Sequence, residues 1–439
     1  MTAEIGILNR QGVALAADSA VTFGSSENSK VLNSANKLFN LVKGMPIGIM
    51  VYGNGSFMGL PWEVVIEEYR RYISSSNIKF DTLEEASDSF INFLGNPDKF
   101  YRNANDETLI YNNLMLAMQE ITEIAGREVY NRFVDRHPTV QETDDIFIGV
   151  LNEVVEEFKS KEFIEGFTQD DIEYIKSRSE NVVKSISSRL VVNLNEENKE
   201  KLKLLAGILI CKDIWLNETG IVIAGYGEED LLPTLQEFYT EGIINKKLKY
   251  KLNKTSKIYQ DDICGHPTAE IVPFAQQEMV YSILTGIDQN LEAFLMKNLD
   301  ESYIEIIEYI EDILQKNGIS LLNKDDNKDN DNCVYREDII NHLFNNLTNL
   351  KSNFSNKQRE KFINPILDMV SLLPKEELAV MAETLVNITS FKRKFTFDAE
   401  TVGGPIDVAV ISKSDGFIWI KRKHYFTKEL NHSYFNINR

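Results

Sequence analysis

The residues whose types could carry out chemistry stand near the start of the chain: Thr2, Asp18 and Lys37. If Met1 is removed, as is usual before a small residue, Thr2 carries both a hydroxyl and a free α-amine. The hydroxyl does not ionise at neutral pH, but an amine with a pKa of about 8 can take its proton and return it to a leaving group. Lys37 would lower the pKa of that amine, and Asp18 would keep the buried ammonium paired. These three types predict a nucleophile with its own base.

Strands must hold these residues in position. Apolar residues alternate along positions 5–7 and 13–17 around a turn at 10–12, which predicts two paired strands. Residues 37–41 and 46–52 predict a second pair, and the second strand of this pair runs into Gly53. A glycine at a strand end lets backbone N–H groups turn toward a ligand at little steric cost.

Three stretches resemble the start of a proteasome β subunit, a member of the N-terminal nucleophile (Ntn) hydrolases. They are Thr2-Ala-Glu-Ile-Gly-Ile, Gly12-Val-Ala-Leu-Ala-Ala-Asp-Ser and Asn36-Lys-Leu-Phe. The spacing from Thr2 to Asp18 matches without a gap, whereas the loop before Lys37 is a few residues longer. The resemblance implies that Thr2 is the nucleophile, with Asp18 and Lys37 as a charged pair beside it.

Each residue taken alone has a plainer explanation. A small residue often follows an initiator methionine, Asp18 could be a turn residue, and Lys37 could be a solvated surface lysine. Their order and near-family spacing favour the catalytic interpretation.

The resemblance implies further site residues on the strand that ends at Gly53. Gly53 would supply the N–H of the oxyanion hole. The alternative interpretation is that Gly53 only forms the turn between a strand and a helix. Val51 and Gly55 would line the pocket for the residue before the cleaved bond, with an apolar preference. The family also places a Gly-Ser-Gly element near 271–276, and this sequence has none there.

The tail carries a second resemblance. In the family, an acid and a hydroxyl residue three apart support the amine of the nucleophile, and Asp398 and Thr401 have that spacing. Glu400 offers a competing register, and simple turn capping is the alternative. The Gly403-Gly-Pro-Ile-Asp-Val-Ala-Val stretch that follows resembles the bacterial proteasome-like proteins called Anbu more than classical β subunits.

The resemblance covers about 2–75, 217–290 and 375–427, and implies an α+β fold: a four-layer αββα sandwich with large helical insertions. The expected core segments are 2–77, 216–300 and 374–439. Between them lie a mainly helical insertion at 78–215 and a second insertion at 301–373 with a polar loop. Strands are expected at 220–227, 233–239, 248–258, 406–411 and 417–420. Helices are expected from 60–62 onward and at 301–322, 339–350 and 376–388. Residues 271–276 are expected to open a further helix.

Composition limits the classes of partner that this protein is expected to bind. The 439 residues carry 47 basic and 67 acidic side chains, and a net charge of −20 argues against nucleic acid. No apolar run is long enough for a membrane span and no leader is evident, so a cytoplasmic location without membrane attachment is expected. The three cysteines and five histidines show no ligand spacing. The Asp/Asn run at 323–332 lacks the glycine and glutamate of a calcium loop, so a surface loop is expected. No metal or cofactor is expected.

The predicted function is that of a threonine peptidase that hydrolyses peptide bonds in peptide or protein substrates. The resemblance implies a homo-oligomer, either a ring or a related assembly. Whether an unfoldase or an activator takes part is left open. Two alternatives remain. One is an Ntn amidase that acts on a small amide, and the other is an inert scaffold whose helical insertions bind a partner.

Overall fold

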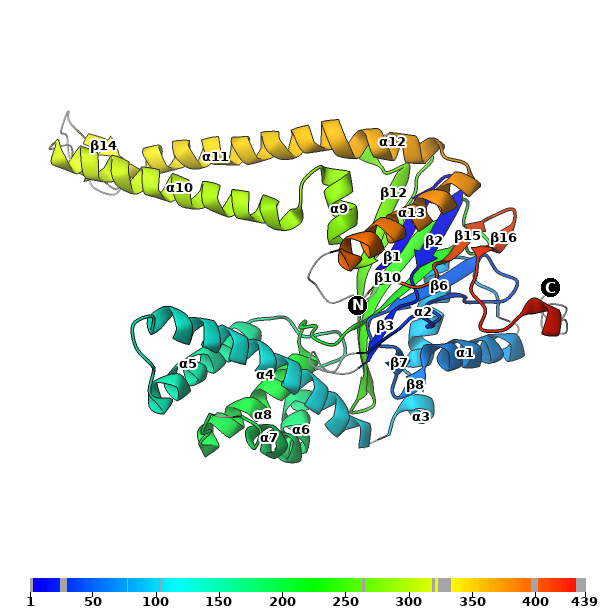
Figure 1. Cartoon of the computed structure of the whole chain (residues 1–439), viewed down its shortest axis with the longest axis horizontal. Helices are drawn as coiled ribbons and strands as arrows, with labels where there is room; N and C mark the ends of the chain where they lie inside the picture. Colours follow the sequence, from blue (N-terminus) through cyan, green and yellow to red (C-terminus); the bar gives the residue numbers. More distant parts are fainter. Residues whose placement is uncertain are drawn as a thin grey trace.

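The computed structural model describes residues 3–23, 30–76, 78–102, 104–190, 192–262, 265–317, 320–322, 333–395 and 402–431. The predicted site residues Thr2, Asp398 and Thr401 lie outside these ranges, as does the polar run 323–332. The described chain is mixed α+β, as predicted, and is built around two five-stranded antiparallel sheets (Figure 1).

The first sheet joins the two ends of the chain. Its strands are, in spatial order, β12 (Ala269–Ala275), β1 (Ala3–Asn9), β2 (Gly12–Ala17), β15 (Asp407–Ser412) and β16 (Gly416–Lys421). The N-terminal hairpin therefore lies between a strand from the middle of the sequence and one from the tail. The predicted strands at 5–17, 406–411 and 417–420 are confirmed.

The second sheet contains the other predicted strands. In spatial order they are β11 (Lys247–Lys257), β10 (Thr234–Ile244), β9 (Thr219–Gly225), β6 (Ile47–Tyr52) and β5 (Leu38–Asn40). Short two-stranded sheets lie in the connections between these strands. They pair β3 (Val21–Phe23) with β4 (Lys30–Leu32), and β7 (Ser56–Phe57) with β8 (Leu60–Pro61).

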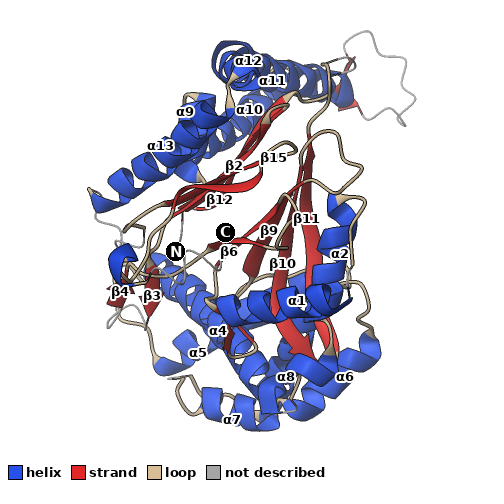
Figure 2. Ribbon diagram, turned by 90° about the vertical axis from the view of Figure 1, so that its right-hand side faces the viewer, coloured by secondary structure: helices blue, strands red, loops and turns tan. Residues whose placement is uncertain are grey.

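The two sheets pack face to face (Figure 2). Leu8 and Leu15 of the first sheet meet Met50 and Val222 of the second in one buried cluster. The approach is close at Gly6, where any side chain would overlap Leu235. A larger residue at this position would require the Leu235 side chain to move.

Helices cover the outer faces of both sheets. On the first sheet, α9 (Glu278–Thr285), α12 (Asn364–Leu372) and α13 (Lys375–Lys394) share a core with alternate residues of β1, β2 and β15. On the second sheet, α1 (Trp62–Ser76), α2 (Leu83–Leu94) and α3 (Pro97–Phe100) pack against β6 and β9.

A helical unit with its own core follows α3. It consists of α4 (Ala104–Arg132), α5 (Val140–Lys159), α6 (Gln169–Arg178), α7 (Glu180–Ser187) and α8 (Glu196–Cys211). Its buried cluster begins at Leu109, so the first part of the predicted insertion 78–215 belongs instead to the layer over the second sheet.

A buried lysine joins this helical unit to the second sheet. Lys249 Nζ of β11 donates to the carbonyl oxygens of Leu209 (2.8 Å) and Ile214 (2.6 Å) and pairs with Glu241 of β10 at 2.9 Å. Both charged side chains are fully buried. The contacts fix the end of α8 against the hairpin of β10 and β11.

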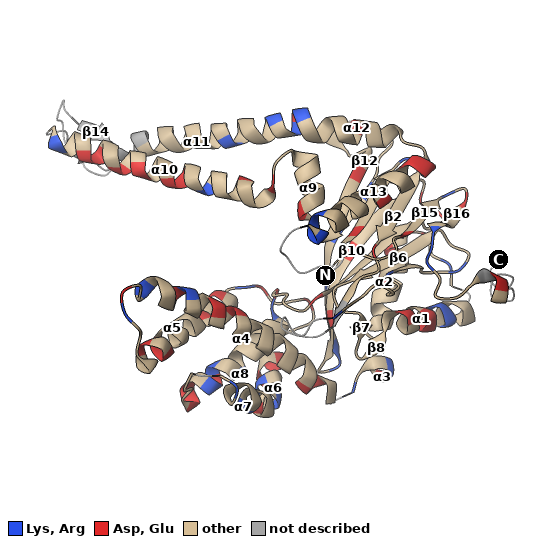
Figure 3. Ribbon diagram, in the orientation of Figure 1, with Lys and Arg blue, Asp and Glu red and all other residues tan. Residues whose placement is uncertain are grey.

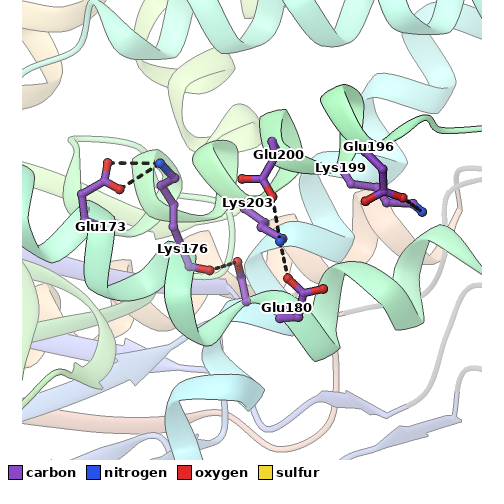
Figure 4. A network of polar contacts seen from close by, with 8 residues as sticks. Glu173, Lys176, Glu180, Glu196, Lys199, Glu200 and Lys203 are labelled. Atoms are coloured by element: carbon purple, nitrogen blue, oxygen red, sulfur yellow. Dashed lines mark hydrogen bonds and ion pairs between the residues drawn. The ribbon is translucent and has the colours of Figure 1, made fainter.

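Surface ion pairs also link the helices of this unit (Figure 4). Lys203 of α8 contacts Glu180 of α7 and, at 2.8 Å, Glu200 of its own helix. Exposed pairs of this kind contribute about 0–1 kcal/mol each. The apolar cluster, rather than these pairs, therefore holds the unit together.

The second insertion is a long helical hairpin that projects away from the sheets (Figure 1). It is formed by α10 (Gln289–Lys316), β13 (Ser320–Leu322), β14 (Cys333–Tyr335) and α11 (Arg336–Gln358), and a π-helical turn, η2 (Arg359–Ile363), leads into α12. The hairpin begins at 289, twelve residues before the predicted 301, and α10 ends at Lys316, so that residues 320–322, predicted to continue this helix, form β13 instead. After β16, one short 3₁₀ turn is described, η3 (Lys428–Leu430).

One predicted element is wrong. Residues 271–276, expected to open a helix, form the strand β12, and the helix α9 starts only at Glu278. Pro273 is tolerated because β12 is an edge strand, where a missing N–H leaves no ladder partner unsatisfied. Within the described ranges, no helix is both long and apolar enough to cross a bilayer.

Candidate active site

Asp18 and Lys37 form a buried ion pair. Lys37 Nζ lies 2.6 Å from Asp18 Oδ1, and the two residues are 5% and 1% exposed. Asp18 directly follows β2 of the first sheet and Lys37 directly precedes β5 of the second. The pair therefore bridges the two sheets at one end of the sandwich. The sequence brought these residues together only as a hypothesis, and the structure places them in contact.

The Asp18 carboxylate is also held by backbone donors. Oδ1 accepts the N–H of Ala3 at 3.3 Å, and Oδ2 accepts the N–H groups of Ala20 (3.3 Å) and Gly403 (2.9 Å). The Asp18 N–H in turn donates to the Ala3 carbonyl at 3.1 Å. Four hydrogen bonds of this kind hold the carboxylate in one orientation. Ala3 is the residue bonded covalently to Thr2, so Asp18 is anchored one peptide from the predicted nucleophile.

The C-terminal segment packs against Asp18 and Ser19. Ser19 donates through its N–H to the Gly403 carbonyl (3.2 Å) and through its hydroxyl to the Pro405 carbonyl. Residues 402–405 thus lie against the Asp18–Ser19 turn, directly after the predicted support residue Thr401. Asp398 and Thr401 themselves lie outside the described residues.

Glu4 is a site residue that the sequence reasoning missed. It is 2% exposed, pairs across the ladder with Ala17, next to Asp18, and neither carboxyl oxygen has a hydrogen-bond partner among the described residues. Burial raises the pKa of Glu4 from its ordinary value of 4.5 to about 8; the Lys37 ammonium opposes this rise and the Asp18 charge adds to it. A neutral carboxyl at pH 7 therefore lies close to the ion pair.

The only signal for Glu4 in the sequence was its position on the second face of the predicted strand, opposite Ile5 and Ile7. The alternation of Ile5 and Ile7 predicted one apolar face and left the other face unassigned, and in the structure β1 lies between two strands and is covered on both faces. Glu4 shares its face with Gly6 and Leu8, and that face looks onto the second sheet.

The end of β6 lies beside Lys37. The Val51 N–H donates to the Lys37 carbonyl at 3.0 Å, and two residues later Gly53 is exposed with φ of +85°. The Val51 side chain is buried in the cluster beneath α1, whereas Gly55 is exposed. The predicted oxyanion residue thus stands at the strand end nearest the ion pair, and the two predicted pocket residues differ in burial.

The end of β12 forms the other flank of β1. Ala275 pairs with Ala3 and has φ of +59°, a left-handed conformation that costs a non-glycine residue about 1 kcal/mol. Gln276 is buried, and its Oε1 accepts from Arg393 Nε of α13 at 2.9 Å. The sequence left this position unassigned because the family's Gly-Ser-Gly element is missing. Backbone strain of this kind gathers at functional sites.

No family model matches the chain, and no curated protein matches it either. The chemistry of the site is therefore argued from its own residues. Asp18 is saturated by Lys37 and three N–H donors, which leaves it unsuited to hold a metal. Within the described part of the chain, no group of three or more His, Cys, Asp or Glu side chains could hold a metal ion. The arrangement places one basic and one acidic side chain, Lys37 and Asp18, beside Ala3. Both side chains are largely closed to water.

Proposed function

We propose that this protein is an Ntn hydrolase, a threonine peptidase in which Thr2, exposed by removal of Met1, is the nucleophile. The observation that carries the proposal is the buried Asp18–Lys37 pair, whose carboxylate also binds the N–H of Ala3. A buried ion pair contributes little to stability compared with apolar packing. Its position one peptide from a threonine gives it a chemical role.

The proposed reaction needs only groups of this chain. The Thr2 hydroxyl attacks the substrate carbonyl carbon while its proton passes to the α-amine, and the oxyanion is stabilised by backbone N–H groups such as that of Gly53. The C–N bond then breaks, and the amine returns the proton to the leaving nitrogen. A water molecule, deprotonated by the same amine, hydrolyses the ester and frees Thr2. Lys37 favours the neutral amine that both steps require.

The finer fold assignment belongs to the same proposal. Two stacked antiparallel sheets with helices on their outer faces are what a four-layer αββα Ntn sandwich requires. The resemblance further leads us to propose a homo-oligomer that works in the cytoplasm on peptide or protein substrates. Asp398 and Thr401 remain proposed supports of the amine.

Purified chain tests the proposal in two steps. Intact mass shows whether Met1 has been removed, since a retained Met1 blocks the amine mechanism. Thr2→Ala and Lys37→Met are then compared with the wild type for cleavage of fluorogenic peptides and of small amides. Both variants are expected to lose at least about a hundredfold in kcat/KM on peptides, and circular dichroism spectra verify that they remain folded.

The substrate panel separates the alternatives. Activity of the wild type on small amides alone, abolished by Thr2→Ala, supports the amidase. Activity that survives Thr2→Ala rules out the nucleophile. A processed, folded wild type that cleaves neither substrate class points to the scaffold.

A further inference from the structure

A hollow of about 360 Å³ opens where the helical unit meets the end of the second sheet. One wall is the connection between β6 and α1, with Asn54, and the other is one face of α4, with Asn105 and Asn112. Asn217, in the connection between α8 and β9, also lines it. A hollow of this size is at the small end of the range for ligand sites, so it suits a single side chain rather than a whole peptide.

The hollow lies beside Gly53, the proposed donor to the oxyanion. Asn54 directly follows Gly53 in the chain. Asn217 directly precedes Glu218, whose carbonyl oxygen would lie 2.4 Å from a Cβ placed on Gly53. A substrate held at the Gly53 N–H can therefore extend a side chain into the hollow.

The polar side chains around the hollow have hydrogen-bonding capacity left. On α4, Asn105, Thr108 and Asn112 follow one another at intervals of three and four, so they share one face of the helix. Their side chains and that of Asn217 make no hydrogen bond within the described part of the chain. A carboxamide offers two N–H donors and one carbonyl acceptor, so these groups can both donate to a ligand and accept from it.

The described residues that line the hollow provide no unpaired charge. They include Glu241 but no lysine or arginine. Glu241 is fully buried: its Oε2 pairs with Lys249 at 2.9 Å, and its Oε1 accepts the N–H groups of Leu216 and Asn217 at 3.3 Å each. Residues 53–62, along the wall on the sheet side, contain no charged side chain (Figure 3). A charged ligand group would find no counter-ion here, and its unpaired burial is costly.

We propose that this hollow binds a substrate side chain that ends in a carboxamide, of which glutamine is the natural example with the longer stem. Met58 and Leu109, which also line the hollow, offer apolar contact to the methylene groups of that stem. Asn105 and Asn112 exchange hydrogen bonds with the amide at its end. The inference rests on the proposed peptidase function and names the substrate class of that site. It gives α4, part of the first helical insertion, a role in specificity.

Substrates of matched length test which group is recognised. Internally quenched fluorogenic peptides carry glutamine, glutamate or methionine at one position, and this position is moved through the three residues on each side of the cleaved bond. The three side chains are nearly equal in length, but only that of glutamine is neutral with both donors and an acceptor. At one position, glutamine is expected to give a kcat/KM at least about tenfold above both others, because the analogues leave polar groups of the hollow unpaired.

Two asparagines on α4 provide matched variants. Asn112→Leu removes a carboxamide from the hollow, and Asn131→Leu makes the same change at an exposed position near the other end of the helix. Neither side chain makes a hydrogen bond within the described part of the chain, so both variants are expected to fold. Asn112→Leu is expected to reduce the preference for glutamine over methionine by about fivefold or more, and to cleave the methionine peptide as well as the wild type does. Asn131→Leu is expected to leave the preference unchanged.

Binding separates this inference from the peptidase proposal. Thr2→Ala lacks the proposed nucleophile and should hold the same peptides uncleaved, so fluorescence anisotropy of labelled peptides gives their dissociation constants. The glutamine peptide is expected to bind at least about tenfold more tightly than the other two, and Asn112→Leu, added to Thr2→Ala, is expected to remove most of this difference. If the preference appears in binding while the wild type cleaves no peptide, the peptidase proposal fails and the assignment of the hollow stands.

Three results would overturn the assignment of the hollow. One is a wild type that cleaves peptides through Thr2 and favours glutamine at no position. Another is a preference that Asn112→Leu leaves intact, or that Asn131→Leu reduces equally. The third is equal binding of the three kinds of peptide to Thr2→Ala, or binding of none.

Discussion

Replacing Glu4 by glutamine should stabilise the protein, and more so as the pH rises. The folded chain holds the pKa of Glu4 at about 8 because of burial, whereas the unfolded chain leaves it near 4.5. Between these values the folded state binds the extra proton, so the stability of the wild type falls as the pH rises through this window. Below about pH 4.5 the carboxyl is neutral in both states and the penalty is absent.

The magnitude follows from the two pKa values. Each pH unit between them corresponds to about 1.4 kcal/mol, so the penalty is on the order of 3 kcal/mol at neutral pH and of 5 kcal/mol above about pH 8. Glu4→Gln keeps the shape and removes the charge. Its free energy of unfolding should therefore exceed that of the wild type by an amount that grows between about pH 5 and about pH 9.

The assay is urea unfolding of both proteins across this pH range, with the difference between them as the observable, since other titrating groups cancel. Glu142→Gln is the control of opposite sign. A hydrogen bond from Arg136 holds the pKa of Glu142 at about 2, aided by the N–H and hydroxyl of Thr139, so this carboxylate stabilises the fold above its unfolded pKa. Its replacement should lower stability by an amount that stays flat from about pH 5 to about pH 9. A pH-independent difference for Glu4→Gln would refute a buried, unpaired carboxyl.

Two further changes test other parts of the description. Lys249→Met leaves Glu241 buried without its cation, and should lower the free energy of unfolding by about 3–5 kcal/mol in urea titrations; a loss below about 1 kcal/mol, typical of surface pairs, would contradict this. Gly53→Ala forces a side chain into a backbone with φ of +85° and against the Glu218 carbonyl, and should cost about 2 kcal/mol or more. If the Gly53 N–H also serves the oxyanion, peptide cleavage falls beyond what the loss of folded protein explains.

Local patterns in the sequence predicted the strands, and the resemblance to a proteasome β subunit predicted the ion pair. Period-two alternation placed β1, β2, β6 and β15 because each has at least one apolar face. The contact of Asp18 with Lys37 was expected from the resemblance to a proteasome β subunit, and the structure places the two side chains 2.6 Å apart.

Other features depend on the tertiary arrangement and left little local signal. Glu4 carried no signal as a site residue, because nothing in a short strand tells whether its second face is covered. Residues 271–276 were expected to open a helix, and the place of Pro273 on a sheet edge is what makes a strand possible there. The helix predicted at 301–322 includes Ile304 and Ile313, which have helical spacing but lie exposed in α10, since one neighbouring helix covers only part of its surface.

The contact between Asp18 and Gly403 joins residues 385 positions apart, and β2 finds its neighbour β15 only after residue 407. The chain must therefore be synthesised past Gly403 before the carboxylate has its full set of donors. Nascent chains and products of premature termination would carry β2 as an open edge and an unfinished site. Formation of the site thus waits for synthesis of β15, and contacts so distant in sequence favour slow folding.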